Sequence, residues 1–364
     1  MDRYDTEFMQ RALRLAERGL YTTDPNPRVG CVIVRDGRVA GEGWHQRAGE
    51  PHAEILALQQ AGEQAAGATA YVTLEPCSHF GKTPPCADAL IQAGVARVVT
   101  AMQDPNPAVA GNGFARLREH GIAVESGVLE QAARAINPGF IKRMESGRPF
   151  VRVKLAMSLD GRTAMASGES QWITGEAARS DVQRLRARSS VIMTGIDTVL
   201  HDDPSLNVRL TSEQLRITGE VRQPHRVVLD SQLRFPPAAK MLSLQGKTTV
   251  VTVKQGRSEL SCDVVSLDAV DGKLDLTSVM SWLAGMQANE VHVEAGATLC
   301  GALLQDKLVD EIVVYIAPHL MGNHARGLFD LPGLEHMADR IRLDFSDVRR
   351  IGKDLRIIAT PSGK

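Results

Sequence analysis

The chain has 364 residues, more than one domain usually contains, so its length favours two domains that each bury a core. Its 42 basic and 43 acidic residues give a net charge of −1, and no basic run with interleaved aromatic residues indicates a nucleic-acid partner. We therefore expect a small-molecule substrate. Five cysteines suit reduced thiols or metal ligands, and no apolar stretch approaches the roughly 18 residues of a membrane helix, so we expect a cytoplasmic protein.

The first part of the chain alternates predicted helices and strands. Apolar residues from Phe8 to Ala16 recur at helical spacing and stop before Gly19, and Asp36-Gly37 predicts the turn of a hairpin. Such alternation predicts a three-layer α/β domain. We expect strands at residues 29–34, 38–44, 70–74, 96–102 and 122–125, and helices at 8–16, around His52, from Cys86 and at 114–120.

Residues 51–86 contain residue types that are typical of a hydrolytic zinc site. His52 and Glu54 follow Pro51, and Cys77 and Cys86 each follow a proline. One imidazole and two thiolates leave one position of a tetrahedral zinc ion open for water, whereas four protein ligands would close it. Zinc lowers the pKa of a bound water to about 7, and a carboxylate can then carry protons to a leaving amine. We therefore predict His52, Cys77 and Cys86 as zinc ligands and Glu54 as the catalytic proton shuttle.

The spacing of the two cysteines departs from the H-x-E…P-C-x-x-C signature of nucleobase deaminases, because residues 78–85 form a longer insert. Pro84-Pro85 predicts a helix that begins near Cys86, whose positive end favours the Cys86 thiolate. His79 lies within the insert, and we expect it to be a loop or pocket residue. Because Glu54 and His52 are two residues apart, they would point in different directions on a regular helix.

A change in pattern near residue 146 predicts the boundary between the domains. Asn137-Pro138-Gly139 and then residues 145–149 interrupt the alternation, and an apolar strand is expected at 150–156. We place the domains at 1–145 and 146–364.

The second half has no dinucleotide fingerprint. In the first domain, Gly111-Asn112-Gly113 begins like one, but Arg116 occupies its last position, and a simple turn is the better interpretation. Residues 294–304, rich in small side chains, follow a predicted strand at 290–293. Small residues that open a helix after a strand can admit a phosphate to exposed backbone amides.

In their order along the chain, these segments resemble the bifunctional deaminase/reductase family of riboflavin biosynthesis. The likeness covers nearly the whole chain and is carried by residues 52–54, 75–79, 81–86, 154–161 and 202–204. It implies an α/β fold with an N-terminal cytidine-deaminase-like three-layer α/β/α domain and a C-terminal dihydrofolate-reductase-like α/β domain. The first domain would hydrolyse the 2-amino group of 2,5-diamino-6-ribosylamino-4(3H)-pyrimidinone 5′-phosphate. The second would use NADPH to reduce the ribosyl group to ribityl, in a homo-oligomer expected to be a dimer through this domain.

The same resemblance implies roles for residues outside the zinc motif. An arginine suits the substrate phosphate because its planar fork binds oxyanions through paired hydrogen bonds. The positions that match substrate contacts are Asn26, Ser170, Arg186, Leu206, Arg209 and Glu294. The positions that match cofactor contacts are Ala156, Trp172, Thr198, Asp202, Ser231, Gly296, Ala297, Thr298, Leu299, Cys300, Gly301 and Ala302.

Two other interpretations remain open from the sequence. A stand-alone nucleoside or guanine deaminase with an unrelated C-terminal domain would share the zinc motif, but it would leave residues 154–161 and 202–204 without explanation. A binding module with structural zinc would need a fourth ligand, for which only His79 is near in sequence.

Overall fold

The computed structural model describes residues 3–78, 85–107, 109–254 and 260–362. The chain divides into two compact units, residues 1–147 and residues 148–364. Within the described ranges, none of the helices combines the length and the apolar character that crossing a membrane requires.

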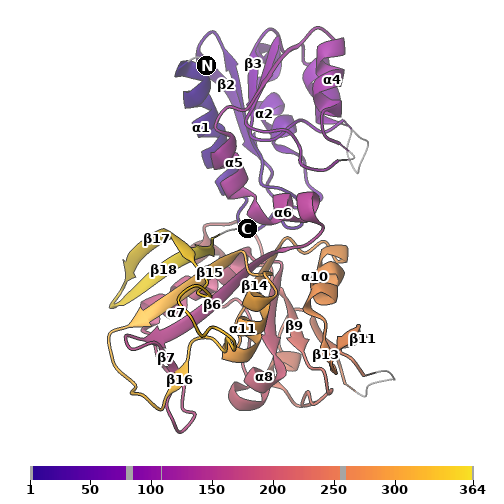
Figure 1. The fold of residues 1–364 in the computed structure, drawn as a ribbon. Coiled ribbons are helices and arrows are strands. Elements are labelled where there is room, and N and C mark those ends of the chain that lie inside the picture. The colour runs from indigo at the N-terminus through magenta and orange to yellow at the C-terminus, as the bar shows by residue number, and fades with distance from the viewer. Residues whose placement is uncertain (1–2, 79–84, 108, 255–259, 363–364) are drawn as a thin grey trace. The chain divides into compact units, whose positions relative to one another are not determined.

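The first unit is a five-stranded mixed sheet with helices on both faces (Figure 1). The strands lie in the order β2-β1-β3-β4-β5, in which β1 is antiparallel to β2 and β3, and β3, β4 and β5 are parallel. Its strands are β1 (Gly30–Arg35), β2 (Arg38–Trp44), β3 (Thr69–Val72), β4 (Arg97–Thr100) and β5 (Ala123–Ser126). Its helices are α1 (Arg3–Glu17), α2 (Ala53–Ala61), the 3-10 helix η1 (Gly62–Ala65), α3 (Cys86–Gln92), α4 (Asn112–Glu119), α5 (Glu130–Ile136) and α6 (Pro138–Ser146).

Alternate residues of the central strands supply two separate cores in this unit. Ile33 of β1 packs with α2, α3 and α4 on one face, whereas its neighbour Val32 packs with α1 and α5 on the other. This is the consequence of strand geometry, in which successive side chains point to opposite faces. The predicted three-layer arrangement is therefore confirmed.

The second unit contains a nine-stranded sheet in the order β11-β10-β9-β8-β14-β6-β15-β18-β17. All neighbours from β11 to β15 are parallel, and β18 and β17 complete one edge in antiparallel pairs. The sheet strands are β6 (Phe150–Ser158), β8 (Val191–Gly195), β9 (His225–Leu229), β10 (Thr248–Thr252), β11 (Asp263–Ser266), β14 (Glu290–Val293), β15 (Glu311–Ala317), β17 (Leu343–Ile351) and β18 (Asp354–Pro361). Two small sheets pair β7 (Arg162–Ala164) with β16 (Arg326–Gly327) and β12 (Ala269–Val270) with β13 (Lys273–Leu274).

Helices cover both faces of this sheet as well. One core contains residues of α10 and α11, and a second on the other face of β8 and β9 contains residues of α8. The helices are α7 (Glu176–Arg188), α8 (Ile196–Asp202), α9 (Ser212–Leu215), the 3-10 helix η2 (Lys240–Ser243), α10 (Leu276–Gly285) and α11 (Ala297–Gln305). The predicted α/β class thus holds for both units.

The segment before residue 148 differs from its sequence-based interpretation. Asn137-Pro138-Gly139 does not simply interrupt the pattern, because Pro138 is the first residue of α6. Proline suits this position, since the first N–H groups of a helix have no partner within the helix. Helix α6 ends at Ser146 and is followed by Gly147, whose φ of 66° favours glycine. The turn expected at Gly111-Asn112-Gly113 instead leads directly into α4, which begins at Asn112.

Candidate active sites

The three predicted zinc ligands come together in the first unit. His52 directly precedes α2, and Cys86 is the first residue of α3. The ligand atoms of His52, Cys77 and Cys86 all lie within 4.8 Å of one another. The backbone angles of His52 are extended, so His52 lies outside α2, the helix that carries Glu54. A regular helix does not run through both residues. His79 lies outside the described residues.

The separations of these atoms fit a tetrahedral zinc ion. The His52 Nδ1 atom lies 3.3 Å from Cys86 Sγ and 3.7 Å from Cys77 Sγ. Bonds of about 2.1 Å to nitrogen and about 2.3 Å to sulfur would place tetrahedral ligands about 3.6 Å apart. The Cys86 backbone N–H also donates to Cys77 Sγ at 3.3 Å, an interaction that favours a thiolate. The residues present therefore fit zinc.

Glu54 lies beside this group with a strongly altered acidity. Glu54 is 3% exposed. Burial is the main cause that raises the pKa of Glu54 to about 7, and the nearby Cys77 thiolate is the second. The Cys86 thiol, together with His52, lowers the pKa of Cys77, and the hydrogen bond with Cys77 raises the pKa of His52. A carboxyl group with a pKa near neutrality can both accept and donate a proton under physiological conditions.

Asn26 is linked to the predicted zinc ligands through His45, a histidine that sequence reasoning missed. Its side-chain nitrogen lies 3.1 Å from Nε2 of His45, and Nδ1 of His45 lies 3.2 Å from the Pro51 carbonyl oxygen. The rings of His45 and His52 meet edge to face, with centroids 5.3 Å apart. The one sequence signal for His45 is its place directly after Trp44, the last residue of the strand predicted at 38–44.

The second candidate site follows the carboxyl ends of four adjacent parallel strands, β9, β8, β14 and β6. Such ends meet at one edge of a sheet, which is where open α/β sheets bind ligands. Ala156 lies near the end of β6 and Ser231 lies just beyond β9. Thr198 and Asp202 lie on α8, which follows β8, and Gly296 caps α11, which follows β14. A side chain added at Gly195 would contact Leu299 of α11 at 3.6 Å, so the starts of α8 and α11 are neighbours.

The remaining positions matched to cofactor contacts have unequal access to this edge. Cys300 packs in the core, and a Cβ on Gly301 would lie 2.0 Å from the Asp330 carbonyl oxygen. Trp172 is 69% exposed, and the Arg179 guanidinium lies over its ring, 4.7 Å from the ring centroid. The Ser231 hydroxyl accepts from the Leu274 N–H. The structure therefore brings together the strand-end residues, whereas Cys300 and Gly301 face the interior of the unit.

Two predicted substrate residues form a buried ion pair with each other. Arg186 donates through Nε at 2.5 Å and through a terminal nitrogen at 2.9 Å to the two carboxylate oxygens of Glu294. It also donates to the Asn207 carbonyl oxygen at 3.0 Å. Burial alone would raise the pKa of Glu294, but the Arg186 charge outweighs it and holds that pKa well below its ordinary range. His292 Nε2, completely buried, lies 3.3 Å from the same carboxylate.

Positive charge gathers around this pair. The pKa of Arg209, an exposed residue, is lowered first by partial burial and then by the charge of Arg186. The charge of Arg179 lowers the same pKa further. Burial lowers the pKa of Lys154, and the charges of Glu294 and Arg186 act on it in opposite directions. Lys154 begins a segment that carries the family resemblance, but sequence reasoning assigned it no role. Leu206 packs in the core, and no contact of Ser170 with this cluster is seen in the described residues.

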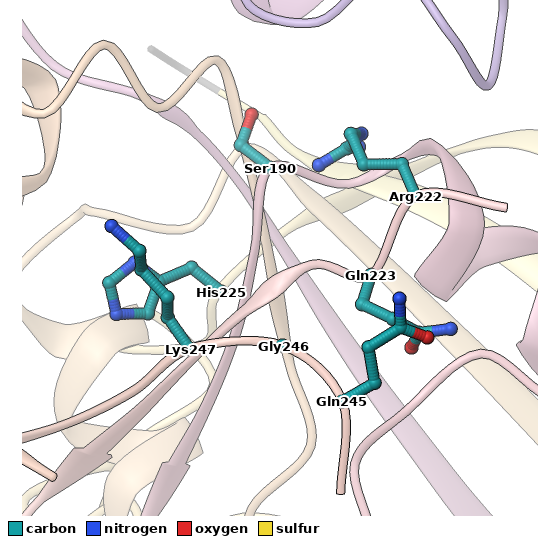
Figure 2. A pocket seen from close by; sticks show the side chains of 7 residues that line it. All are labelled: Ser190, Arg222, Gln223, His225, Gln245, Gly246 and Lys247. Carbon is teal, nitrogen blue, oxygen red and sulfur yellow. The ribbon is translucent and has the colours of Figure 1, made fainter. Parts of the chain in front are cut away.

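A further depression lies at the opposite edge of the second sheet, near the amino ends of β8, β9 and β10. Its volume is about 430 Å³, and Figure 2 shows the side chains around it. Arg222 donates to the Ser189 carbonyl oxygen at 2.7 Å, and His225 contacts the Thr249 hydroxyl at 2.8 Å. Arg222 and His225 are therefore engaged by contacts within the protein. The lining residues are Ser190, Arg222, Gln223, His225, Gln245, Gly246 and Lys247.

Comparison with known families defines the class of each unit. Residues 2–102 match the family described as the cytidine and deoxycytidylate deaminase zinc-binding region. Residues 149–357 match the RibD C-terminal domain. The protein is thus a two-domain enzyme with a zinc-binding deaminase domain followed by a reductase domain.

Relatives match over almost the whole length. The riboflavin biosynthesis protein RibD of Escherichia coli K12 is 54% identical over 96% of this chain and 98% of its own, and that of Haemophilus influenzae is 51% identical over 99% and 98%. A solved structure of Acinetobacter baumannii RibD is 48% identical, with a TM-score of 0.92 over 99% of each chain. The solved diaminohydroxyphosphoribosylaminopyrimidine deaminase/5-amino-6-(5-phosphoribosylamino)uracil reductase of Thermotoga maritima is 33% identical, with a TM-score of 0.87 over 98% of this chain and 99% of its own.

The chain belongs to the RibD family of riboflavin biosynthesis proteins. The family predicted from the motifs is therefore confirmed. The alternative of a deaminase with an unrelated C-terminal domain is not favoured, because the second half matches the RibD C-terminal domain.

Proposed function

We propose that the chain catalyses two successive steps of riboflavin biosynthesis in two domains. Residues 1–145 would hydrolyse the 2-amino group of 2,5-diamino-6-ribosylamino-4(3H)-pyrimidinone 5′-phosphate, and residues 146–364 would reduce the ribosyl side chain to ribityl with NADPH. The observation that carries the first step is the convergence of His52, Cys77 and Cys86 beside the buried Glu54. The likeness to the Thermotoga maritima protein, whose name combines a deaminase and a reductase, supports both steps.

In the deaminase domain, His52, Cys77 and Cys86 hold zinc, and Glu54 moves the proton. Zinc, when bound, supplies the Lewis acidity that hydrolytic removal of an amine requires. Glu54 accepts a proton while it is ionised and returns it to the leaving nitrogen, a role suited to a pKa of about 7. Asn26, whose side-chain amide is held by His45, would contact the pyrimidine.

In the reductase domain, we assign the two ligands to different parts of the strand-end site. The strand-end residues of β6, β8, β9 and β14 contact NADPH, with backbone amides at the start of α11 available to a phosphate. The exposed Arg209, next to Arg186 and Arg179, binds the phosphate of the substrate. Glu294, held by Arg186, orients the hydroxyl groups of the ribose.

We also infer a cytoplasmic location and a dimer formed through the reductase domain. All five cysteines are free, which suits a reducing compartment. Strand β17 lies at the edge of the nine-stranded sheet and is exposed along most of its length, including Phe345 at 67% and Val348 at 56%. An exposed edge strand that presents apolar side chains such as these favours pairing with a second copy. A monomeric mass in solution, measured by light scattering, would contradict the dimer.

Glu54→Gln tests the deaminase assignment. The substitution keeps the size of the side chain and all three ligands, so we expect bound zinc to remain while ammonia release falls by about 10²- to 10⁴-fold. The matched control is Glu63→Gln, at an exposed position of the same domain, which should leave ammonia release unchanged. Undiminished ammonia release by a zinc-loaded Glu54→Gln protein would refute the role of Glu54.

A further inference from the structure

Glu75 is a buried carboxylate that follows β3 and immediately precedes the segment leading to Cys77. Its residue is 3% exposed, and four backbone N–H groups donate to it. Oε1 accepts from Gly113 at 2.9 Å and from Phe114 at 3.3 Å. Oε2 accepts from Gly111 at 3.0 Å and from Asp104 at 3.2 Å.

Three of these donors lie at the start of α4. Gly111 is the residue before the helix and has no side chain that could cap it, so Glu75 accepts the N–H bonds that a local cap would otherwise take. Hydrogen bonds to a carboxylate are about twice as strong as neutral ones, and a negative charge is favoured at this end of a helix. Glu75 therefore fixes α4 against the backbone that leads to Cys77.

The contact between α4 and this backbone is very close. A Cβ on Gly113 would lie 2.1 Å from the Pro76 carbonyl oxygen, so only glycine allows the first turn of α4 to pack there. Cys77 is held on its other side by α3, because the Ala87 N–H donates to the Cys77 carbonyl oxygen at 3.1 Å. An ion pair between Arg116 of α4 and Asp88 of α3 connects the two helices. Helix α4 thus supports the segments that carry both cysteine ligands.

We propose that Glu75 is a positioning residue for zinc: by binding the start of α4 it fixes the Glu75-Pro76 backbone and so places the Cys77 thiolate for coordination. This inference rests on the zinc site proposed above. A site whose ligands are already in place binds its metal without the additional cost of ordering them, and outer-shell partners of metal ligands typically contribute about 10- to 100-fold in affinity.

The first variant is Glu75→Gln, which keeps the shape of the side chain but replaces one acceptor oxygen with an amide group that faces two N–H donors. We expect the dissociation constant for zinc, measured by competition with a chromogenic chelator on the full chain, to rise by about 10- to 100-fold. A second variant, Gly113→Ala, keeps the carboxylate but displaces Pro76, and it should raise the same constant. Glu63→Gln is the matched control and should bind zinc as the unchanged protein does.

The thermal unfolding of the zinc-free proteins separates positioning from general stability. If Glu75→Gln lowers the unfolding temperature of the zinc-free protein but leaves the zinc dissociation constant unchanged, Glu75 is merely structural and the proposal is overturned. A Glu75→Gln protein that remains folded without zinc and binds zinc more weakly supports it. Failure of the unchanged protein to bind zinc would overturn both this inference and the zinc site, whereas equal affinity in the two proteins would overturn only the role of Glu75.

Discussion

Neighbouring groups shift the pKa values of the buried carboxylates at the two sites in opposite directions. Glu54 has burial and a thiolate nearby, both of which disfavour its charge, and its pKa rises to about 7. Glu294 is also largely buried, but its two hydrogen bonds with Arg186 keep it ionised. The first group is therefore suited to move protons, and the second is suited to hold a fixed orientation.

Arg209 is the arginine of the cationic cluster that remains exposed to a ligand. Arg209→Ala should raise the KM for the deaminated substrate, because the phosphate loses its partner, while NADPH affinity stays near normal. Arg209→Lys should recover only part of the loss, since an ammonium group cannot replace the planar fork. Steady-state kinetics with each ligand varied in turn measures both effects. Weaker NADPH binding with an unchanged substrate KM would mean that the roles of substrate and cofactor at this position must be exchanged.

Residues that belong to a recognisable sequence motif could be predicted, and those whose partners lie outside any motif could not. His52 and Glu54 belong to a short pattern whose chemistry is evident from the residue types. His45 and Glu75 depend on partners that only the fold brings near, such as Gly113 for Glu75, 38 positions further along the chain. The pairing of Arg186 with Glu294 was missed for the same reason, although the resemblance implies a role for each residue individually.

At the scale of elements, close packing of helices explains several small residues that could be mistaken for ligand contacts. The resemblance matches the short segment 296–302 to the cofactor, yet part of it faces the interior. Gly301 is required because the backbone of Asp330 passes directly over α11, and the Asp330 N–H donates to the Ala297 carbonyl oxygen at 3.2 Å. The small residues after the predicted strand at 290–293 indicated the start of a helix, but they did not show which face of that helix meets another segment of the chain.

Gly301→Ala tests this packing. The added methyl group meets backbone atoms that cannot move aside easily, so we expect a destabilisation of about 1–3 kcal/mol. The reductase activity should be lost at a lower temperature on heating. Gly285→Ala in α10 is the matched control, because no atom lies within 4 Å of its added Cβ and alanine is favoured in helices. Equal heat resistance of the Gly301→Ala protein and the unchanged protein would be incompatible with this close contact.

At the scale of the whole molecule, the chain consists of two units with separate cores and separate sites. The predicted zinc ligands and Glu54 lie in residues 1–147, and the strand-end site lies in residues 148–364. Alternation of strands and helices predicted the α/β class of the first unit, and the family resemblance implied the α/β class of the second. The order of nine strands in the second sheet could not be derived, because strand neighbours depend on contacts between distant parts of the chain.

Because each unit has its own core, a fragment that begins near Ser146 should fold and oxidise NADPH when given the already deaminated substrate. Circular dichroism and NADPH absorbance measure folding and activity. The corresponding full chain with Glu54→Gln is the control, since it contains an intact reductase domain without deamination. An inactive fragment that is nonetheless dimeric would argue for one interdependent unit.

The central claim is that deamination and reduction are separate steps performed in this order by the two domains. It is tested most directly by supplying the diaminopyrimidinone ribose phosphate to the zinc-loaded chain with and without NADPH, while ammonia release and NADPH oxidation are recorded separately. We expect ammonia in both reactions and NADPH oxidation that begins only after ammonia has been released. NADPH oxidation that precedes ammonia release, or ammonia release that requires NADPH, would contradict the account.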